Sequence, residues 1–373
     1  MFNFASSIKP VHPIPNAAQP VLRRDGAASL AAGGAGGAGG AAPRPLASTA
    51  LVTCHYGGRG DLRRDAALRA VKAWNSQISR PDSGLFLELV CPGQEPCFSR
   101  ADFPEWLQYV RIHGKERNRS LFQKEALWNL GARLTNAGKI LFLDNDCMPV
   151  GCPDYFAQIF GACAPGKCVH AAWHIIHEGQ PEGCHDYYST FSPAEDVPSD
   201  ARRFPGMGYC ITRRDHHAMD GFNPFAITGS GDAVFIWECL KSIQYPINYA
   251  MRYHQALIRP NRPQLEPVAL KGVTVQHNFH GPKSDRGYLW SRYAVELFGV
   301  PQAYCHIDAS GLLAWNDPEF PLSYFAMEKA RMHTKQELYT LICEVFKQRL
   351  DAIEARGQDK DYHYDPTERN QFS

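Results

Sequence analysis

Short apolar runs alternate with helical patterns along the middle of the chain. Runs with strand character occur at 50–56, 85–90, 109–112 and 140–143. Apolar residues at helical spacing follow the first run and precede the last, most clearly at 61–78 and 120–135. Strands that alternate with helices favour a mainly parallel sheet with right-handed crossovers. The pattern therefore predicts an α/β fold with a mainly parallel central sheet and flanking helices.

The alternation loosens after residue 150. We expect a helix near 154–161, a strand at 168–176, and then a loop rich in glycine, proline and aspartate that ends near residue 204. Loops of this length inside a compact domain are usually binding lids or disordered segments, and this one is interpreted as a lid. The later expected elements are a strand at 209–212, a short helix at 213–219, a helix that starts at Asp232 and a strand at 272–276.

The two ends of the chain differ from its middle. Residues 1–48 mix prolines with an Ala/Gly tract that cannot bury enough surface to offset its ordering entropy, so they are expected to form a disordered leader. Residues 49–300 carry the α/β pattern and are expected to form one domain. Residues 301–356 are expected to form a helical extension packed on that domain, because their helical pattern has one apolar stripe. The polar residues 357–373 are expected to form a disordered tail.

Composition narrows the classes of partner. The 373 residues carry a formal net charge of +1, which gives no overall field that favours nucleic acid or an anionic membrane. No apolar run approaches the roughly 20 residues that span a bilayer, and the N-terminus lacks the pattern of a secretion signal. The 12 cysteines are scattered without a CxxC pair, which argues against a zinc site or a disulfide framework. We therefore expect a soluble, cytoplasmic protein.

The strand at 140–143 ends abruptly in Asp144, Asn145 and Asp146. In an open α/β sheet, ligands bind at the carboxyl ends of the strands. Because side chains alternate along an extended chain, Asp144 and Asp146 should project to the same side and reach one divalent cation, with Asn145 facing the other way. The same residues are also good turn formers, since their side chains hydrogen-bond their own backbone. The segment is therefore compatible with both a metal site and an ordinary turn.

Three further segments carry candidate chemistry. Asp232 follows Gly231 at a helix start, where it is either an N-cap or a functional acid. A later strand ends in His277, with His280 shortly after it, and histidine is a suitable nitrogen ligand for Mn²⁺. The glycine turn at 57–60 reads GGRG, which matches neither a Walker A loop nor GxGxxG, so an ordinary turn between strand and helix is favoured over a phosphate cradle.

The order of these segments resembles that of nucleotide-sugar-dependent glycosyltransferases of the GT-A fold, close to the family 2 and galactosyltransferase-like groups. The similar segments, over roughly residues 50–295, are ALVTCHY, ERNRSLFQKEALWNLGAR, FLDND, PGMGYCITRRDHHAMDGF, GSGDAVF and HNFHG followed by an arginine. In this family an acidic pair usually precedes the final helix, and here Gly231 stands in place of its first member. The resemblance implies a GT-A-like, Rossmann-like fold and a hexosyltransferase-type activity.

The resemblance also implies roles for individual residues. Asp144 would contact the ribose or a Mn²⁺ or Mg²⁺ ion, Asp146 would bind the ion, and His277 would be the third ligand, with His280 as the alternative. Asp232 would deprotonate the acceptor hydroxyl, which gives inversion at the anomeric carbon; if Asp232 only caps its helix, a retaining mechanism stays open. The other residues implied at the nucleotide and its diphosphate are Thr53, His55, Arg59 and either Arg117 or Arg119.

The resemblance favours one class of donor, but it does not identify the acceptor. A UDP-sugar is the favoured donor, whereas the acceptor hydroxyl could belong to a saccharide, a lipid carrier, a protein or a modified DNA base. The net charge of +1 weighs mildly against DNA. Two other functions fit the same acids: a nucleotidyltransferase that couples a sugar phosphate to a nucleoside triphosphate, and a non-catalytic sugar- or nucleic-acid-binding module of the same fold.

Overall fold

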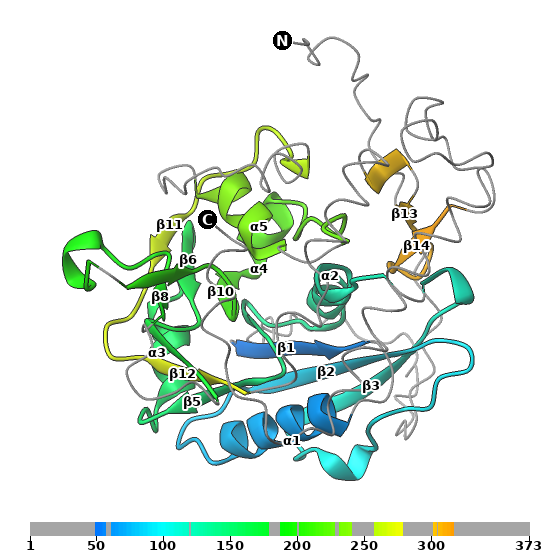
Figure 1. The fold of residues 1–373 in the computed structure, drawn as a ribbon, viewed down its shortest axis with the longest axis horizontal. Helices are drawn as coiled ribbons and strands as arrows, with labels where there is room; N and C mark the ends of the chain where they lie inside the picture. The colour runs from blue at the N-terminus through cyan, green and yellow to red at the C-terminus, as the bar shows by residue number, and fades with distance from the viewer. Residues whose placement is uncertain are drawn as a thin grey trace, which may run out of the picture.

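The described residues form a central sheet with helices on both faces and a second, smaller sheet beside it (Figure 1). The computed structural model describes residues 49–56, 61–118, 121–178, 187–199, 201–227, 231–240, 257–278, 301–303 and 305–316. The predictions that fall outside these ranges concern the leader at 1–48, the turn at 57–60 with Arg59, Arg119, His280, the helical pattern beyond residue 316 and the tail at 357–373.

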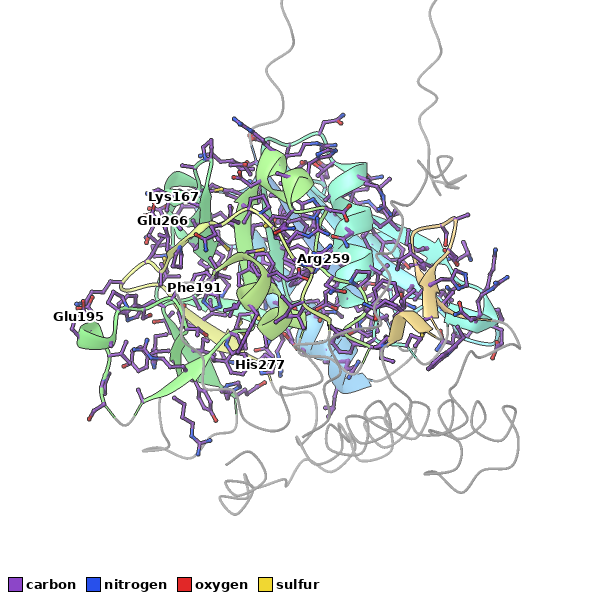
Figure 2. All side chains as sticks on the ribbon, turned by 90° about the horizontal axis from the view of Figure 1, so that it is seen from above. Lys167, Phe191, Glu195, Arg259, Glu266 and His277 are labelled. Atoms are coloured by element: carbon purple, nitrogen blue, oxygen red, sulfur yellow. The ribbon has the colours of Figure 1, made fainter. Side chains whose placement is uncertain are left out.

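The central sheet has seven strands in the order β11-β6-β10-β4-β1-β2-β3. All neighbours in it run parallel except β10, which is antiparallel to both β4 and β6. The strands are β1 (Thr49–His55), β2 (Ser83–Val90), β3 (Leu107–His113), β4 (Lys139–Leu143), β6 (Lys167–His170), β10 (Gly208–Thr212) and β11 (Glu266–Val268). At the β11 edge Lys167 and Glu266 form an ion pair of 3.5 Å (Figure 2). The predicted α/β fold with a mainly parallel central sheet is confirmed.

Alternate residues of the central strands face opposite sides of the sheet and meet different helices. The helices are α1 (Asp61–Asn75), α2 (Lys124–Leu134), α3 (Tyr155–Ala162), α4 (Arg213–Ala218) and α5 (Gly231–Cys239). Leu51 and Leu141 pack in one buried cluster with Trp74 of α1. Val52 and Phe142 pack in another with residues of α2 and α5. Helices α1 and α2 accordingly lie on opposite faces of the sheet (Figure 1), which explains why its strands read as continuous apolar runs.

The second sheet has five strands in the order β5-β12-β7-β8-β9. They are β5 (Cys147–Val150), β7 (His174–His177), β8 (Tyr187–Ser189), β9 (Arg202–Phe204) and β12 (Thr274–His277). Strand β5 begins directly after Asp146 and pairs antiparallel with β12, so that Cys147 lies opposite His277. The turn at residues 144–146 therefore joins the two sheets and faces the end of β12.

This second sheet differs from what the apolar pattern predicts. The strand expected at 168–176 is in fact two strands, β6 and β7, which belong to different sheets. An unbroken apolar run carries no signal for such a division. Strand β5 was not expected because it is short and contains Pro149, but it is an edge strand, where proline is tolerated. The loop expected up to residue 204 contains the short strands β8 and β9.

Residues 301–303 and 305–316 brace the start of α2. They form a 3-10 turn (Pro301–Ala303) and a hairpin of β13 (Cys305–Ile307) and β14 (Leu313–Trp315), so this described part of the expected helical extension is not α-helical. The backbone of Leu313 is bound on both sides by Gln123, with its N–H donating to Oε1 at 3.0 Å and its oxygen accepting from Nε2 at 2.7 Å. In the described ranges, no helix has both the length and the apolar character needed to cross a membrane.

Helix α2 approaches β1 closely at Gly131. A Cβ on this residue would lie 2.4 Å from Cγ1 of Val52, which is fully buried. The substitution Gly131→Ala should therefore push α2 away from the sheet and lower the free energy of unfolding by about 1–3 kcal/mol. Urea denaturation monitored by circular dichroism measures this change.

Gly161 provides the matched control for that prediction. It also lies in a helix, α3, but a Cβ there would meet nothing within 4 Å. Since alanine is the better helix former, Gly161→Ala should be neutral or raise the stability by up to about 1 kcal/mol. A similar loss of stability in both variants would contradict close packing at Gly131.

Candidate functional site

The turn at residues 144–146 lies where the strand order of the central sheet reverses. From β1 the sheet continues to β2 and β3 on one side and to β4 on the other, with α1 and α2 packed on opposite faces. In α/β sheets, ligands bind in the crevice outside the carboxyl ends of the strands at such a switch point. Here Nδ2 of Asn145 lies 3.1 Å from Nδ1 of His55, the last residue of β1. Side chains therefore join the ends of β4 and β1 at this crevice.

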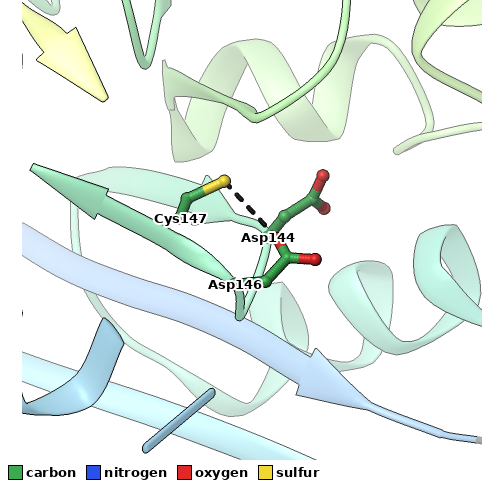
Figure 3. A group of neighbouring side chains, drawn as sticks. All are labelled: Asp144, Asp146 and Cys147. Atoms are coloured by element: carbon green, nitrogen blue, oxygen red, sulfur yellow. Dashed lines mark hydrogen bonds between the residues drawn. The ribbon is translucent and has the colours of Figure 1, made fainter. Parts of the chain in front are cut away.

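Asp144 and Asp146 project to the same side, as the sequence predicts (Figure 3). They do so from a turn, in which the N–H of Cys147 donates to the carbonyl oxygen of Asp144 at 3.2 Å, and not from an extended strand. Potential ligand atoms of Asp144, Asp146 and Cys147 all lie within 4.8 Å of one another. The segment is thus both a turn and a cluster of candidate metal ligands.

The thiol of Cys147 supports this cluster as a hydrogen-bond donor. It is fully buried, and its Sγ lies 3.6 Å from Oδ1 of Asp146 (Figure 3). Burial raises the pKa of the Cys147 thiol well above its usual value, and the neighbouring carboxylates of Asp146 and Asp144 add to this effect. The protonated thiol is a poor ligand for a hard cation, so the two carboxylates are the candidate ligands.

His277 lies beside these carboxylates at the end of β12. Its Nε2 is 3.3 Å from Oδ2 of Asp146. Its Nδ1 is 3.2 Å from Nδ1 of His177, at the end of the neighbouring parallel strand β7. A hydrogen bond between these two nitrogens orients the His277 ring so that Nε2 faces the acid turn. Sequence analysis did not single out His177, and only the pairing of β7 with β12 places it here.

Lys124 links the acid turn to the start of α5. Its Nζ lies 3.4 Å from Oδ1 of Asp144 and 3.0 Å from each carboxylate oxygen of Asp232. Burial by itself would lower the pKa of Lys124, but the charges of Asp144 and Asp232 outweigh burial and hold it well above its usual value. The carboxylate of Asp232 is therefore directed at an ammonium group, and within the described residues it makes no hydrogen bond to the backbone of α5.

Glu125, the second residue of α2, is buried against the first residue of α5. A Cβ on Gly231 would lie 1.9 Å from Oε1 of Glu125. A larger residue at position 231 would therefore require the carboxyl group of Glu125 to move, because that group already fills the space of a side chain there. Burial is the main cause that raises the pKa of Glu125 to about 8; Lys124 lowers it and Asp232 raises it further.

The structure brings four of the sequence-predicted residues into one cluster, namely Asp144, Asp146, Asp232 and His277. His55 lies at its edge through Asn145. Thr53 is fully buried inside β1, and Arg117 is half-buried in the 3-10 turn Glu116–Asn118 before α2. Arg59 and Arg119 lie outside the described residues.

Lys124 and Glu125 were not predicted as site residues, although their position on the apolar face of a predicted helix was a signal in the sequence. Lys124 lies three residues before Leu127 and four before Trp128, on the apolar face of the predicted helix. Both charged residues are almost fully buried, and charged side chains are rarely buried unless they are paired or functional. Charged residues on the apolar face of a predicted helix are thus candidate site residues, in addition to acids at the ends of strands.

The chain matches no known family model and no curated protein by sequence. Among solved structures it has a remote likeness to S. aureus TarS, with 11% identity and a TM-score of 0.33 over 68% of this chain and 40% of TarS. A structure of S. aureus TarS residues 1–349 in complex with UDP-GlcNAc gives 12% identity and a TM-score of 0.36 over 68% of this chain and 67% of that one. At these TM-scores the likeness shows nothing about the function of the site.

Proposed function

We propose that this protein is a metal-dependent glycosyltransferase that moves a sugar from a nucleotide-sugar donor, with a UDP-sugar favoured, to an acceptor hydroxyl. The observation that carries the proposal is the link through Lys124, which holds a candidate base, Asp232, beside the acid pair at the switch point of the sheet. A base and a site for a charged leaving group, held side by side, are the two requirements of sugar transfer.

The donor atoms of the cluster fit a divalent cation. Asp144, Asp146 and Asp232 bring three carboxylates close to one ammonium, that of Lys124, which leaves an excess of negative charge in a partly buried place. Carboxylate oxygens with one imidazole nitrogen are suitable ligands for Mn²⁺, and Mg²⁺ also accepts the carboxylates. Asp144, Asp146 and Nε2 of His277 would hold the ion, and His177 would orient His277. When bound, the ion would neutralise the leaving diphosphate as a Lewis acid.

The residues of the chain have separate tasks in the proposed transfer. Asp232 accepts the proton of the acceptor hydroxyl as its oxygen attacks the anomeric carbon. The bond from that carbon to the donor phosphate breaks, and its electron pair leaves with the nucleoside diphosphate. Lys124 orients Asp232 through both carboxylate oxygens. Attack on the face opposite the leaving group gives inversion. The nucleotide would lie near His55 and Asn145 at the carboxyl ends of β1 and β4.

A thermal-shift panel tests the proposal. The protein is mixed with UDP-, GDP-, CMP- and dTDP-sugars and with free nucleoside triphosphates, each with and without Mn²⁺. A ligand that binds only the folded state raises its melting temperature, so we expect a Mn²⁺-dependent rise with one class of nucleotide sugar, the UDP-sugars. A rise with triphosphates alone would instead support a nucleotidyltransferase. Silence across the whole panel would contradict donor binding and favour a non-catalytic module.

A further inference from the structure

Glu125 is a buried acid to which the proposed transfer assigns no task. Its exposed fraction is 2%, and no other residue of the described structure hydrogen-bonds to either of its carboxyl oxygens. An unpaired polar group destabilises a folded protein when it is buried. A buried, unpaired acid beside a candidate catalytic group is therefore a candidate functional residue.

The carboxyl group of Glu125 lies at the start of α5, next to the candidate base. A Cβ on Gly231 would lie 1.9 Å from Oε1 of Glu125 and 2.3 Å from its Cδ. The preceding residue of α2, Lys124, contacts both carboxylate oxygens of Asp232, the residue after Gly231. The first two residues of α2 therefore meet the first two residues of α5. Lys124 brings an ammonium group to the carboxylate of Asp232, and Glu125 brings a carboxyl group to Gly231.

The charges around Glu125 decide where a proton resides. The titratable groups that face it are Lys124 from α2, Asp232 from α5, Asp144 from the acid turn, Cys54 from β1 and Tyr56 directly after β1. Lys124 is bound to both oxygens of Asp232, whereas the oxygens of Glu125 are unpaired. The ammonium of Lys124 is therefore engaged by Asp232, and the buried carboxyl group of Glu125, which the ammonium does not bind, is the one that holds a proton.

We propose that Glu125 is a positioning residue. It supplies from α2 a second carboxyl group, in the space that a side chain at position 231 would fill, and it holds a proton there so that the ammonium of Lys124 stays bound to Asp232. The role of Asp232 as base rests on the proposed function, but the pairing of the two acids does not. Protonated Glu125 adds no repulsion to Asp232 and leaves Lys124 bound to it. Ionised Glu125 would compete for the same ammonium and weaken the hold on the base.

The pairing of Glu125 with Asp232 should make the stability of the protein depend on pH, and this can be measured without any transfer activity. Folding raises the pKa of Glu125 from 4.5 to about 8, so between these values the folded state binds more protons than the unfolded state. The stability that Glu125 contributes therefore falls as the pH rises through this window and is constant above it. The variant Glu125→Gln keeps the shape but removes this ionisation. Its urea midpoint should exceed that of the wild type by a margin that grows from about pH 4.5 to about pH 8.

The matched control for this measurement is Glu105→Gln, because Glu105 is exposed and its midpoint should follow the wild type at each pH. A constant margin for Glu125→Gln over the whole window would overturn the proposal. In the transfer assay, kcat of the wild type should fall above about pH 8, and the Glu125→Gln variant should lose this alkaline fall. The same alkaline fall in both proteins would also overturn it.

Relocation of the acid separates its chemistry from its volume. Glu125→Ala opens the space beside Asp232 and should lower kcat by about tenfold or more, and Gly231→Asp alone should also lower kcat because its Cβ requires the carboxyl group of Glu125 to move. In the double variant Glu125→Ala/Gly231→Asp the space is open and a carboxyl group returns from the other helix, so most of the lost kcat should return. The control Glu125→Ala/Gly231→Asn fills the same space with a neutral amide, so its kcat should also recover near neutral pH, but without an alkaline fall.

The relocation test distinguishes a failure of the role proposed for Glu125 from a failure of the proposed glycosyltransferase function. The same pH profile of kcat with Asp and with Asn at position 231 would show that no acid at this place titrates, and it would overturn the role of Glu125. Absence of any transfer by the wild type would instead reject the proposed function. In that case the pH dependence of the urea midpoint still tests the pairing of Glu125 with Asp232.

Discussion

The substitution Asp232→Asn should stop sugar transfer while it leaves donor binding intact. An amide cannot accept the proton of the acceptor hydroxyl, and loss of a general base lowers kcat by about 10²–10⁴-fold. The amide oxygen can still accept a hydrogen bond from Lys124, which now lies 3.0 Å from both carboxylate oxygens. The fold should therefore persist. Steady-state kinetics with the donor identified in the panel measures kcat, and isothermal titration measures donor affinity.

Asp220→Asn is the matched control for this experiment. Asp220 is exposed, its side chain pairs only at the surface with Arg259 and Arg262, and its φ of 57° is one that asparagine adopts readily. The kcat of the Asp220→Asn variant should equal that of the wild type. If Asp232→Asn keeps normal kcat but loses thermal stability, Asp232 acts only in the ion pair with Lys124 and a retaining mechanism becomes the better proposal.

The substitution Asp146→Asn should remove the metal dependence of donor binding. Asp146 would supply a charged oxygen ligand, and its neighbours His277 and Cys147 cannot replace it. Loss of a residue that merely supports a ligand costs about 10–100-fold in metal affinity, so loss of the ligand itself should cost more. Titration of Mn²⁺ in the presence of UDP, followed by electron paramagnetic resonance, measures the change.

The stability of the same variant separates a ligand role from a structural one. Asp144 and Asp232 share the ammonium of Lys124, and Asp146 lies close to Asp144, so removal of the charge of Asp146 should relieve repulsion. We therefore expect the metal-free melting temperature of Asp146→Asn to equal or exceed that of the wild type. An unchanged Mn²⁺ affinity would remove Asp146 from the site. A large fall in the metal-free melting temperature would indicate that its contact with His277 is structural.

Several features of this protein were determined by sequence patterns that are local. The run Ile140 to Leu143 is buried between two layers of helices, and it ends where the acids begin. A strand end and its turn depend on adjacent residues, so Asp144 and Asp146 were found from sequence and are held together by the turn itself. The mainly parallel order of the sheet follows from the alternation of strands and helices.

Only the tertiary structure decided which distant residues meet the acid pair. Strands β6 and β7 lie in one apolar run but in different sheets, and β7 brings His177 to His277, which is 100 residues away. Lys124 and Asp232 are 108 residues apart and meet because α2 and α5 cover the same face. Such contacts depend on how whole elements pack, which no local pattern encodes. The sequence therefore determined the acids, and the packing of α2 and α5 on one face determined which charged groups lie beside them.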